Sequence, residues 1–271
     1  MTVQSIAKQP KPDSQGVLLI HASAGTGRSW AAVASSLANL YNVVVPDRLG
    51  YGRGDVWSTG TPAPLEAEAQ HLAGFLCTHD EGVHVVAHSY GGAVAIELAL
   101  RWPHLVRSLT LFEPGRFALL LDRTDCDDER GEIVQVGRTV GLWTMSGRSE
   151  AAAAMFIDYW SGPGTWDQLD DAKRKRIAGY MPKVAAEFDA AFADRTPLTR
   201  YKALGMPVHL MMGSTSPAPV RRIVGIMAEV LPNACTVELT GVGHMGPVTH
   251  PAQFMAQLPT WLTTEPMKLA A

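Results

Sequence analysis

The chain has 271 residues, of which 46% are hydrophobic and 18% are charged, and this balance excludes a disordered chain. Its formal net charge is −3, and it has no basic stripe interleaved with aromatic residues, so a nucleic-acid-binding protein is excluded. Three cysteines, Cys77, Cys126 and Cys235, lie far apart without CxxC spacing, which argues against a metal site or a disulfide framework.

The N-terminal segment has no apolar run long enough for a signal peptide, and no apolar stretch of the chain is long enough to span a membrane. We therefore expect a soluble, cytoplasmic protein. Unpaired thiols suit such a reducing compartment. A small, neutral or weakly charged molecule is the partner that this composition favours.

Short aliphatic runs bounded by Gly, Pro and Asp predict buried strands, and segments with helical spacing separate them. Strands that alternate with helices indicate an α/β fold with a mostly parallel, doubly wound sheet. The predicted strands are residues 17–20, 43–45, 84–87, 109–112 and 208–212, and the predicted helices are residues 30–40, 65–76 and 93–101.

The alternation stops between residues 112 and 207, where the composition is helical and no strand is predicted. We interpret residues 116–202 as a helical cap inserted into a core domain of residues 1–115 and 203–271. Most of the large apolar side chains of this cap are expected to pack in its interior, and a minority to line a pocket. Their spacing does not define how Trp143, Trp160 and Phe188 face that pocket.

A nucleophile elbow is predicted at residues 85–93, Val-Val-Ala-His-Ser-Tyr-Gly-Gly-Ala, where an apolar strand passes through a tight turn into a helix. Small residues must flank the serine because strand and helix approach closely, and Ala87 and Gly91 occupy those positions. Ala87 stands where a glycine is usual. The context favours Ser89 as a nucleophile over a purely structural turn.

A serine hydroxyl needs a base to remove its proton during attack. Among nine histidines, His244 lies in a Gly-rich loop after the strand-like residues 236–239, near the C-terminal end of the sequence, and we predict that it is this base. His250 precedes Pro251 at the expected start of the last helix, where a capping or surface role is favoured.

Four segments, residues 21–30, 46–54, 87–92 and 243–244, together resemble the α/β-hydrolase superfamily. The resemblance covers nearly the whole chain except the cap. It implies the α/β-hydrolase fold and a serine hydrolase of the esterase type. No cofactor or metal is expected, since His84 and His88, though four apart, lie on a predicted strand and its elbow and not on a Zn-binding helix face.

The resemblance also implies an oxyanion hole made by the backbone N–H groups of Ser23 and Tyr90. In the loop that begins at His21, Ala22 replaces the family's usual glycine, and His21 becomes a structural residue beneath the loop. Residues 46–54 match a structural turn of the family, so their GxGxG spacing does not indicate a dinucleotide site.

A carboxylate is needed to orient the histidine and complete a Ser-His-acid triad, and none stands at its usual place in this sequence. The family normally carries an acid in the loop after the strand at 208–212, but here that loop reads Gly-Ser-Thr-Ser-Pro. Glu113 ends the preceding strand, 24 residues after Ser89, where side chains of neighbouring parallel strands face the same site. Some branches, the haloalkane dehalogenases among them, carry their acid at this strand end.

We therefore predict Glu113 as the acid that orients His244, with a water or Ser216 as the alternative. The triad predicts hydrolysis of an ester-like bond of a small hydrophobic substrate, with a carboxylesterase as the plainest case and a lactone, thioester or carbon–carbon bond also possible. Dehalogenase and epoxide hydrolase chemistry would require Asp in place of Ser89. A cofactor-free lyase, oxygenase or perhydrolase, or a ligand-binding protein of this fold, stays an alternative.

Overall fold

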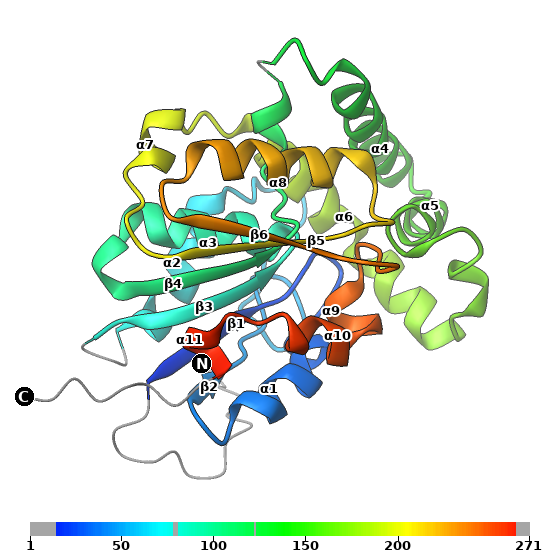
Figure 1. Ribbon diagram of the computed structural model, residues 1–271. Helices are drawn as coiled ribbons and strands as arrows, with labels where there is room; N and C mark the ends of the chain where they lie inside the picture. Colours follow the sequence, from blue (N-terminus) through cyan, green and yellow to red (C-terminus); the bar gives the residue numbers. More distant parts are fainter. Residues whose placement is uncertain (1–14, 78–80, 122, 264–271) are drawn as a thin grey trace, which may run out of the picture.

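A computed structural model describes residues 15–77, 81–121 and 123–263 of the chain (Figure 1). Its centre is a six-stranded parallel sheet in the order β2-β1-β3-β4-β5-β6. The strands are β1 (Gly16–Ile20), β2 (Asn42–Val44), β3 (Val83–His88), β4 (Val106–Phe112), β5 (Val208–Gly213) and β6 (Ala234–Leu239). The five predicted strands and the strand-like segment 236–239 all lie in this sheet.

Helices cover both faces of the sheet because successive strand side chains point to opposite sides. Leu18 and Ile20 of β1 pack in one cluster with α2 (Leu65–Leu76), α3 (Tyr90–Arg101) and α8 (Ala218–Val230). Val17 and Leu19 pack on the opposite face, against α1 (Ala31–Leu37), α10 (Pro251–Ala256) and α11 (Thr260–Thr263). The predicted doubly wound α/β fold is confirmed.

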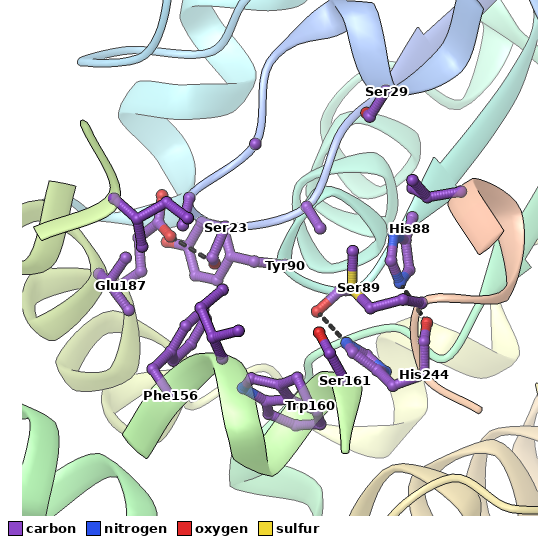
Figure 2. A pocket seen from close by; sticks show the side chains of 18 of the residues that line it. Ser23, Ser29, His88, Ser89, Tyr90, Phe156, Trp160, Ser161, Glu187 and His244 are labelled. Carbon is purple, nitrogen blue, oxygen red and sulfur yellow. Dashed lines mark hydrogen bonds between the residues drawn. The ribbon is translucent and has the colours of Figure 1, made fainter. Parts of the chain in front are cut away.

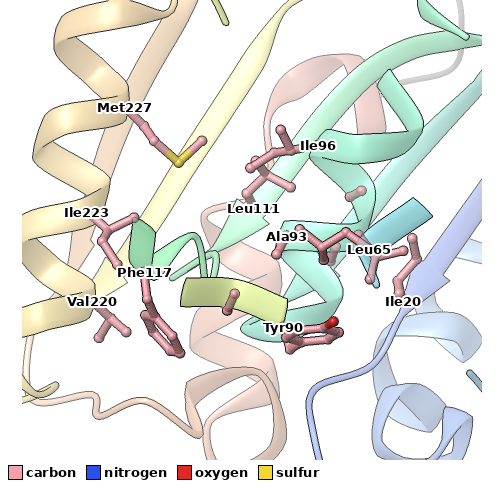
Figure 3. Packing of buried hydrophobic residues seen from close by; sticks show 14 of the residues in the cluster. Ile20, Leu65, Tyr90, Ala93, Ile96, Leu111, Phe117, Val220, Ile223 and Met227 are labelled. Carbon is pink, nitrogen blue, oxygen red and sulfur yellow. The ribbon is translucent and has the colours of Figure 1, made fainter. Parts of the chain in front are cut away.

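The larger of the two clusters continues from the sheet into the helices beyond it (Figure 3). Leu111 of β4 lies between Ile96 of α3 and Met227 of α8, and Phe117 extends the cluster toward the helices that follow β4. Burial of an aliphatic or aromatic side chain of this size stabilises a fold by about 1.5–3 kcal/mol.

Two predicted helices differ from the structure at their ends. In place of one helix over residues 30–40, the structure has a 3-10 turn, η1 (Gly27–Trp30), that ends at Trp30, followed by α1, which stops at Leu37. The helix predicted from residue 93 begins three residues earlier, at Tyr90, because the chain turns directly from the elbow into α3. The helix after His250 is α10, which α11 follows, so α10 is not the last helix.

The segment between β4 and β5 is helical, and the part that the structure describes contains no strand. Its main helices, α4, α5 and α6, pack against one another beyond one end of the sheet (Figure 1). Its elements are η3 (Phe117–Leu120), α4 (Asp127–Met145), α5 (Ser149–Ser161), η4 (Trp166–Gln168), α6 (Asp171–Ala193) and α7 (Leu198–Lys202). The division into a core and a cap stays a prediction, and we refer to α4–α6 as the helical insertion.

Buried Arg116 joins the two ends of this segment. Its Nε donates to the hydroxyl of Tyr201 at 2.8 Å, and its Nη1 lies 3.2 Å from Asp194 Oδ2. Arg116 therefore holds the chain leaving β4 against the chain returning toward β5. Within the described residues, no helix has the length and apolar character that crossing a bilayer requires. The prediction that no signal peptide is present falls on N-terminal residues outside the described ranges.

Three histidines near the first strands are buried and neutral. Burial and the charge of Arg48 lower the pKa of His21 to about 3, and burial and the charge of Arg107 lower that of His84 to about 4. Burial, followed by the neighbouring His244, holds the pKa of His88 well below its usual value. In the folded chain these rings resist protonation, whereas unfolded histidines titrate near pH 6.5.

Acidification is therefore expected to destabilise the fold before the carboxylates titrate. Because the folded pKa values are depressed, the stabilisation is complete above pH 6.5 and is lost as pH falls toward 4 and below. Each proton taken up on unfolding contributes about 1.4 kcal/mol per pH unit, so three histidines give a slope of about 4 kcal/mol per pH unit near pH 5. Urea unfolding at pH 7, 6 and 5 measures the slope, and His84→Gln should reduce it by about a third. A free energy of unfolding that stays constant from pH 7 to 5 would contradict the expectation.

Candidate active site

Ser89 occupies a strained turn between β3 and α3. Its φ is +55°, its N–H donates to the carbonyl of Phe112 at 3.0 Å, and its own carbonyl accepts from Gly92 and Gly115. A Cβ added at Gly91 would lie 2.5 Å from the carbonyl oxygen of His21, so only glycine permits α3 to pass this close to β1. The elbow therefore presents Ser89 at the carboxyl end of the sheet.

Ser89, His244 and Glu113 are joined by hydrogen bonds. His244 Nε2 lies 3.0 Å from Ser89 Oγ, and His244 Nδ1 lies 2.6 Å from Glu113 Oε2. The three side chains come from different loops at one end of the sheet, and all are buried. The histidine ring can thus accept a proton from Ser89 while the carboxylate faces its other nitrogen, the geometry of general-base activation.

Glu113 is held on both carboxylate oxygens. Its Oε1 accepts from the backbone N–H of Gly213 at 2.7 Å, which leaves Oε2 for His244. The residue follows β4 directly and has a φ of +47°. Ser216, the alternative partner of His244, has a buried Oγ that the structure leaves without a hydrogen-bond partner. The carboxylate at the end of β4 is thus the group that meets His244.

Two further rings flank His244. His88 Nε2 donates to the carbonyl of His244 at 2.8 Å, which fixes the backbone of the loop that carries His244. Trp160 of α5 lies across the imidazole with ring centroids 4.1 Å apart (Figure 2). His250 is exposed, and its Nδ1 lies 2.8 Å from the hydroxyl of the neighbouring Thr249. Of the two candidate histidines, the structure brings only His244 to Ser89.

The two residues predicted to form the oxyanion hole both border the pocket around Ser89. Tyr90 is the first residue of α3, where N–H groups lack partners within the helix and the helix dipole favours negative charge. Ser23 lies in the loop after β1, followed by Ala24 with a φ of +55°. Among the described residues, the non-glycine positions with positive φ are Ala24, Ser89 and Glu113, so backbone strain is concentrated at this site.

A cavity of about 320 Å³ lies between the strand ends and the helical insertion. Phe156 and Trp160 of α5 form its wall opposite Ser89 (Figure 2). Phe188 of α6 also lines it, whereas Trp143 packs against Arg148 instead. The other apolar residues of the lining are Ala22, Ala24, Phe117, Ile157, Ile177, Val184, Met245 and Val248.

The loop at 46–54 is structural. Asp47 accepts from the backbone N–H groups of Gly27 and Arg53, each at 2.7 Å, and so ties the turn to the loop after β1. His21 accepts from the N–H of Arg48 at 3.0 Å through Nε2 and approaches the carbonyl of Ala22 through Nδ1. Across the described residues, no group of His, Cys, Asp and Glu is arranged to hold a metal ion.

Sequence reasoning missed a buried ion cluster beside the pocket. Lys183 and Glu187 of α6 meet Arg48 of the loop after β2 and Glu68 of α2, and all four side chains are almost fully buried. Charged residues four apart on a helix normally indicate a solvated face, and nothing in the local pattern distinguishes this pair. Only the packing of α6 against the core reveals their burial.

Residues 17–258 match the family model described as "Alpha/beta hydrolase family". The dihydrolipoyllysine-residue acetyltransferase component of the acetoin cleaving system of Cupriavidus necator is 29% identical over 255 residues, which cover 90% of this chain and 63% of that protein. Lipase LipV of Mycobacterium tuberculosis is 39% identical over 100 residues, 36% of this chain and 37% of the lipase. In both comparisons the chain spans less than two thirds of the relative's own length.

Among solved structures, a thermophilic esterase from Thermogutta terrifontis superposes with a TM-score of 0.72 at 21% identity. The superposition covers 97% of this chain and 98% of the esterase. At this identity the likeness concerns the fold alone, over nearly the whole length of both chains.

Proposed function

Because the chain belongs to the alpha/beta hydrolase family, we propose that it is a serine hydrolase that cleaves an ester-like bond through an acyl-enzyme on Ser89. The observation that carries this proposal is the continuous hydrogen-bonded path from Ser89 through His244 to Glu113, at 3.0 and 2.6 Å. Carboxylic ester hydrolysis is the reaction that we propose first, and names such as lipase and esterase among the similar proteins agree with it.

In the acylation step, Ser89 Oγ attacks the carbonyl carbon while its proton passes to His244 Nε2. Glu113 stabilises the resulting imidazolium through Nδ1–H. The carbonyl oxygen becomes an oxyanion, which we assign to the N–H groups of Ser23 and Tyr90. The tetrahedral intermediate then collapses, the bond to the leaving oxygen breaks, and His244 Nε2 gives its proton to the departing alcohol.

In the deacylation step, a water molecule takes the place of the alcohol. His244 Nε2 accepts a proton from the water as its oxygen attacks the acyl carbon. Collapse of the second intermediate breaks the bond to Ser89 Oγ, which regains the proton from His244. The carboxylic acid leaves, and the same two N–H groups serve both intermediates.

The pocket supports a hydrophobic acyl or aromatic group as the substrate's larger part. A cavity of about 320 Å³ lies at the small end of the usual range for ligand pockets. Phe117 stacks on Phe188, and Phe156 meets both Phe188 and Trp160 edge-on, so much of the wall is aromatic. We also propose a cytoplasmic location, which the three unpaired cysteines support.

A chain-length series of p-nitrophenyl esters tests this function. We expect a burst of p-nitrophenol close to one equivalent, followed by slower turnover, with an optimum at short to medium acyl chains because the pocket is small. The variant Val184→Phe places a larger side chain in the pocket lining and should shift the optimum to shorter chains while the burst with the acetate ester persists. Ligand binding without any burst would instead favour a binding protein, and inertness toward all esters would favour a lyase or carbon–carbon hydrolase.

A further inference from the structure

Glu187 lines the pocket, yet its carboxylate is directed at Ser23 and not at Ser89 or His244 (Figure 2). The hydroxyl of Ser23 donates to Glu187 Oε2 at 2.5 Å, within the range of charge-assisted hydrogen bonds. Glu187 belongs to α6 in the helical insertion, whereas Ser23 belongs to the loop after β1. One short bond therefore joins the insertion to the loop that we assign to the oxyanion hole.

The other contacts of Glu187 keep its carboxylate fixed. Tyr51 donates to the same Oε2 at 2.9 Å, Arg48 donates to Oε1 at 2.8 Å, and Lys183 Nζ lies 3.6 Å from Oε1. Burial alone would raise the pKa of Glu187, but the charges of Arg48 and Lys183 and the hydrogen bonds outweigh it and hold the pKa below its usual value. An ionised carboxylate only accepts hydrogen bonds, so Ser23 must be the donor.

The charges around Glu187 are balanced within the cluster. Glu68 accepts from Arg48 at 3.1 Å and from Lys183 at 2.5 Å, so two carboxylates face two cations. Arg48 is also held between the rings of Tyr51 and Tyr90, with 4.9 Å from its guanidinium carbon to each ring centroid. A neutral, rigid cluster can fix Ser23 without opposing a negative charge on the substrate's carbonyl oxygen.

The loop itself needs such a constraint because Ala24 is held at a backbone φ of +55°, which residues other than glycine rarely adopt. Within the loop, the N–H of Gly25 reaches the carbonyl of Ala22 at 3.3 Å, a long bond. The Ser23–Glu187 bond is the strong contact between this loop and α6. Its removal leaves a strained backbone with less to hold it in place.

We propose that Glu187 is a positioning residue, which acts through the Ser23 hydroxyl to hold the Ser23 N–H toward the oxyanion, so that docking of α6 completes the oxyanion hole. This inference rests on the proposed function. It makes the helical insertion part of the machinery for transition-state stabilisation, in addition to forming the pocket wall.

Ser23→Ala tests the inference with the least disturbance, because it removes the hydroxyl and keeps the backbone N–H and the whole ion cluster. We expect kcat for the best p-nitrophenyl ester to fall about 10- to 100-fold with KM changed less than about threefold, since only the transition state carries the oxyanion. Affinity for an alkylboronic acid, which forms a tetrahedral adduct on Ser89, should fall by a similar factor. Ser146→Ala is the matched control: Ser146 is exposed and lies outside the pocket lining, and its hydroxyl likewise donates within its own segment, to the carbonyl of Leu142.

Two further variants separate positioning from a general loss of structure. Glu187→Gln should lower kcat. In the double variant Ser23→Ala/Glu187→Gln, the fold-decrease in kcat should be smaller than the product of the two single fold-decreases, because both substitutions act through one hydrogen bond. Ala24→Gly in the Ser23→Ala background should restore part of kcat, because glycine adopts the positive φ without strain.

Two results overturn the inference in distinguishable ways. If the wild type shows a burst and Ser23→Ala keeps wild-type kcat and boronic acid affinity, Glu187 does not position the oxyanion hole, while the proposed function stands. If the wild type shows neither a burst nor covalent labelling of Ser89 by a fluorophosphonate, the proposed function fails and the inference fails with it.

Discussion

Ser89→Ala is expected to reduce kcat for ester hydrolysis by about 10⁴-fold or more, because no other group takes the place of the attacking oxygen. The variant should fold normally. Alanine already occupies a backbone with φ of +55° at Ala24, the same value as at Ser89, and the bonds of the elbow use only the backbone of residue 89. A residual rate above that in water is expected from the remaining oxyanion donors.

Steady-state and burst kinetics measure this effect, and a fluorophosphonate probe followed by peptide mass spectrometry locates the labelled residue. Ser146→Ala, at an exposed serine outside the pocket lining, should label and turn over like the wild type, which controls for the loss of a serine hydroxyl. Persistent labelling of Ser89→Ala at another residue would remove Ser89 as the nucleophile.

Glu113→Gln is expected to lower kcat by about 10⁴-fold while KM changes little. The amide oxygen can still accept from the N–H of Gly213, so the amide nitrogen turns toward His244. An amide N–H facing Nδ1 forces that nitrogen to be an acceptor and places the proton on Nε2, which can then no longer accept the proton of Ser89.

Turnover of the best p-nitrophenyl ester and circular dichroism of the purified variant check this prediction. Glu238→Gln, at an exposed carboxylate paired with Arg221, should keep wild-type activity and controls for the loss of one charge. Activity close to wild type in Glu113→Gln would show that His244 does not depend on the carboxylate at the end of β4.

Much of the fold, and the three residues that the structure joins by hydrogen bonds, could be predicted from local sequence patterns together with the resemblance to the superfamily. Apolar runs mark the strands because buried parallel strands need apolar residues on both faces. The elbow at Ser89 is visible because close packing of strand, turn and helix admits only small residues at 87 and 91. Glu113 could be predicted because the loop at 213–217, where the resemblance places the acid, holds no carboxylate, and the end of β4 is the position that some branches of the superfamily use instead.

The ion cluster and the pocket wall could not be predicted in the same way. Glu187 meets Ser23 across a separation of 164 residues, and this contact depends on how α6 docks on the core. Trp160 reaches His244 for the same reason, through the placement of α5. Helical spacing defines which residues share a face of a helix, but the partner of that face is decided by tertiary packing.

The placement of the acid frees the loop after β5 from carrying a carboxylate. Thr215, in the loop after β5, donates its N–H to the carbonyl of Val242, and its hydroxyl lies near the position that a Cβ would take at Gly243. The loop after β5 is thereby tied to the loop of His244 through its backbone. It needs no carboxylate of its own, because Glu113 reaches His244 Nδ1 from the end of β4.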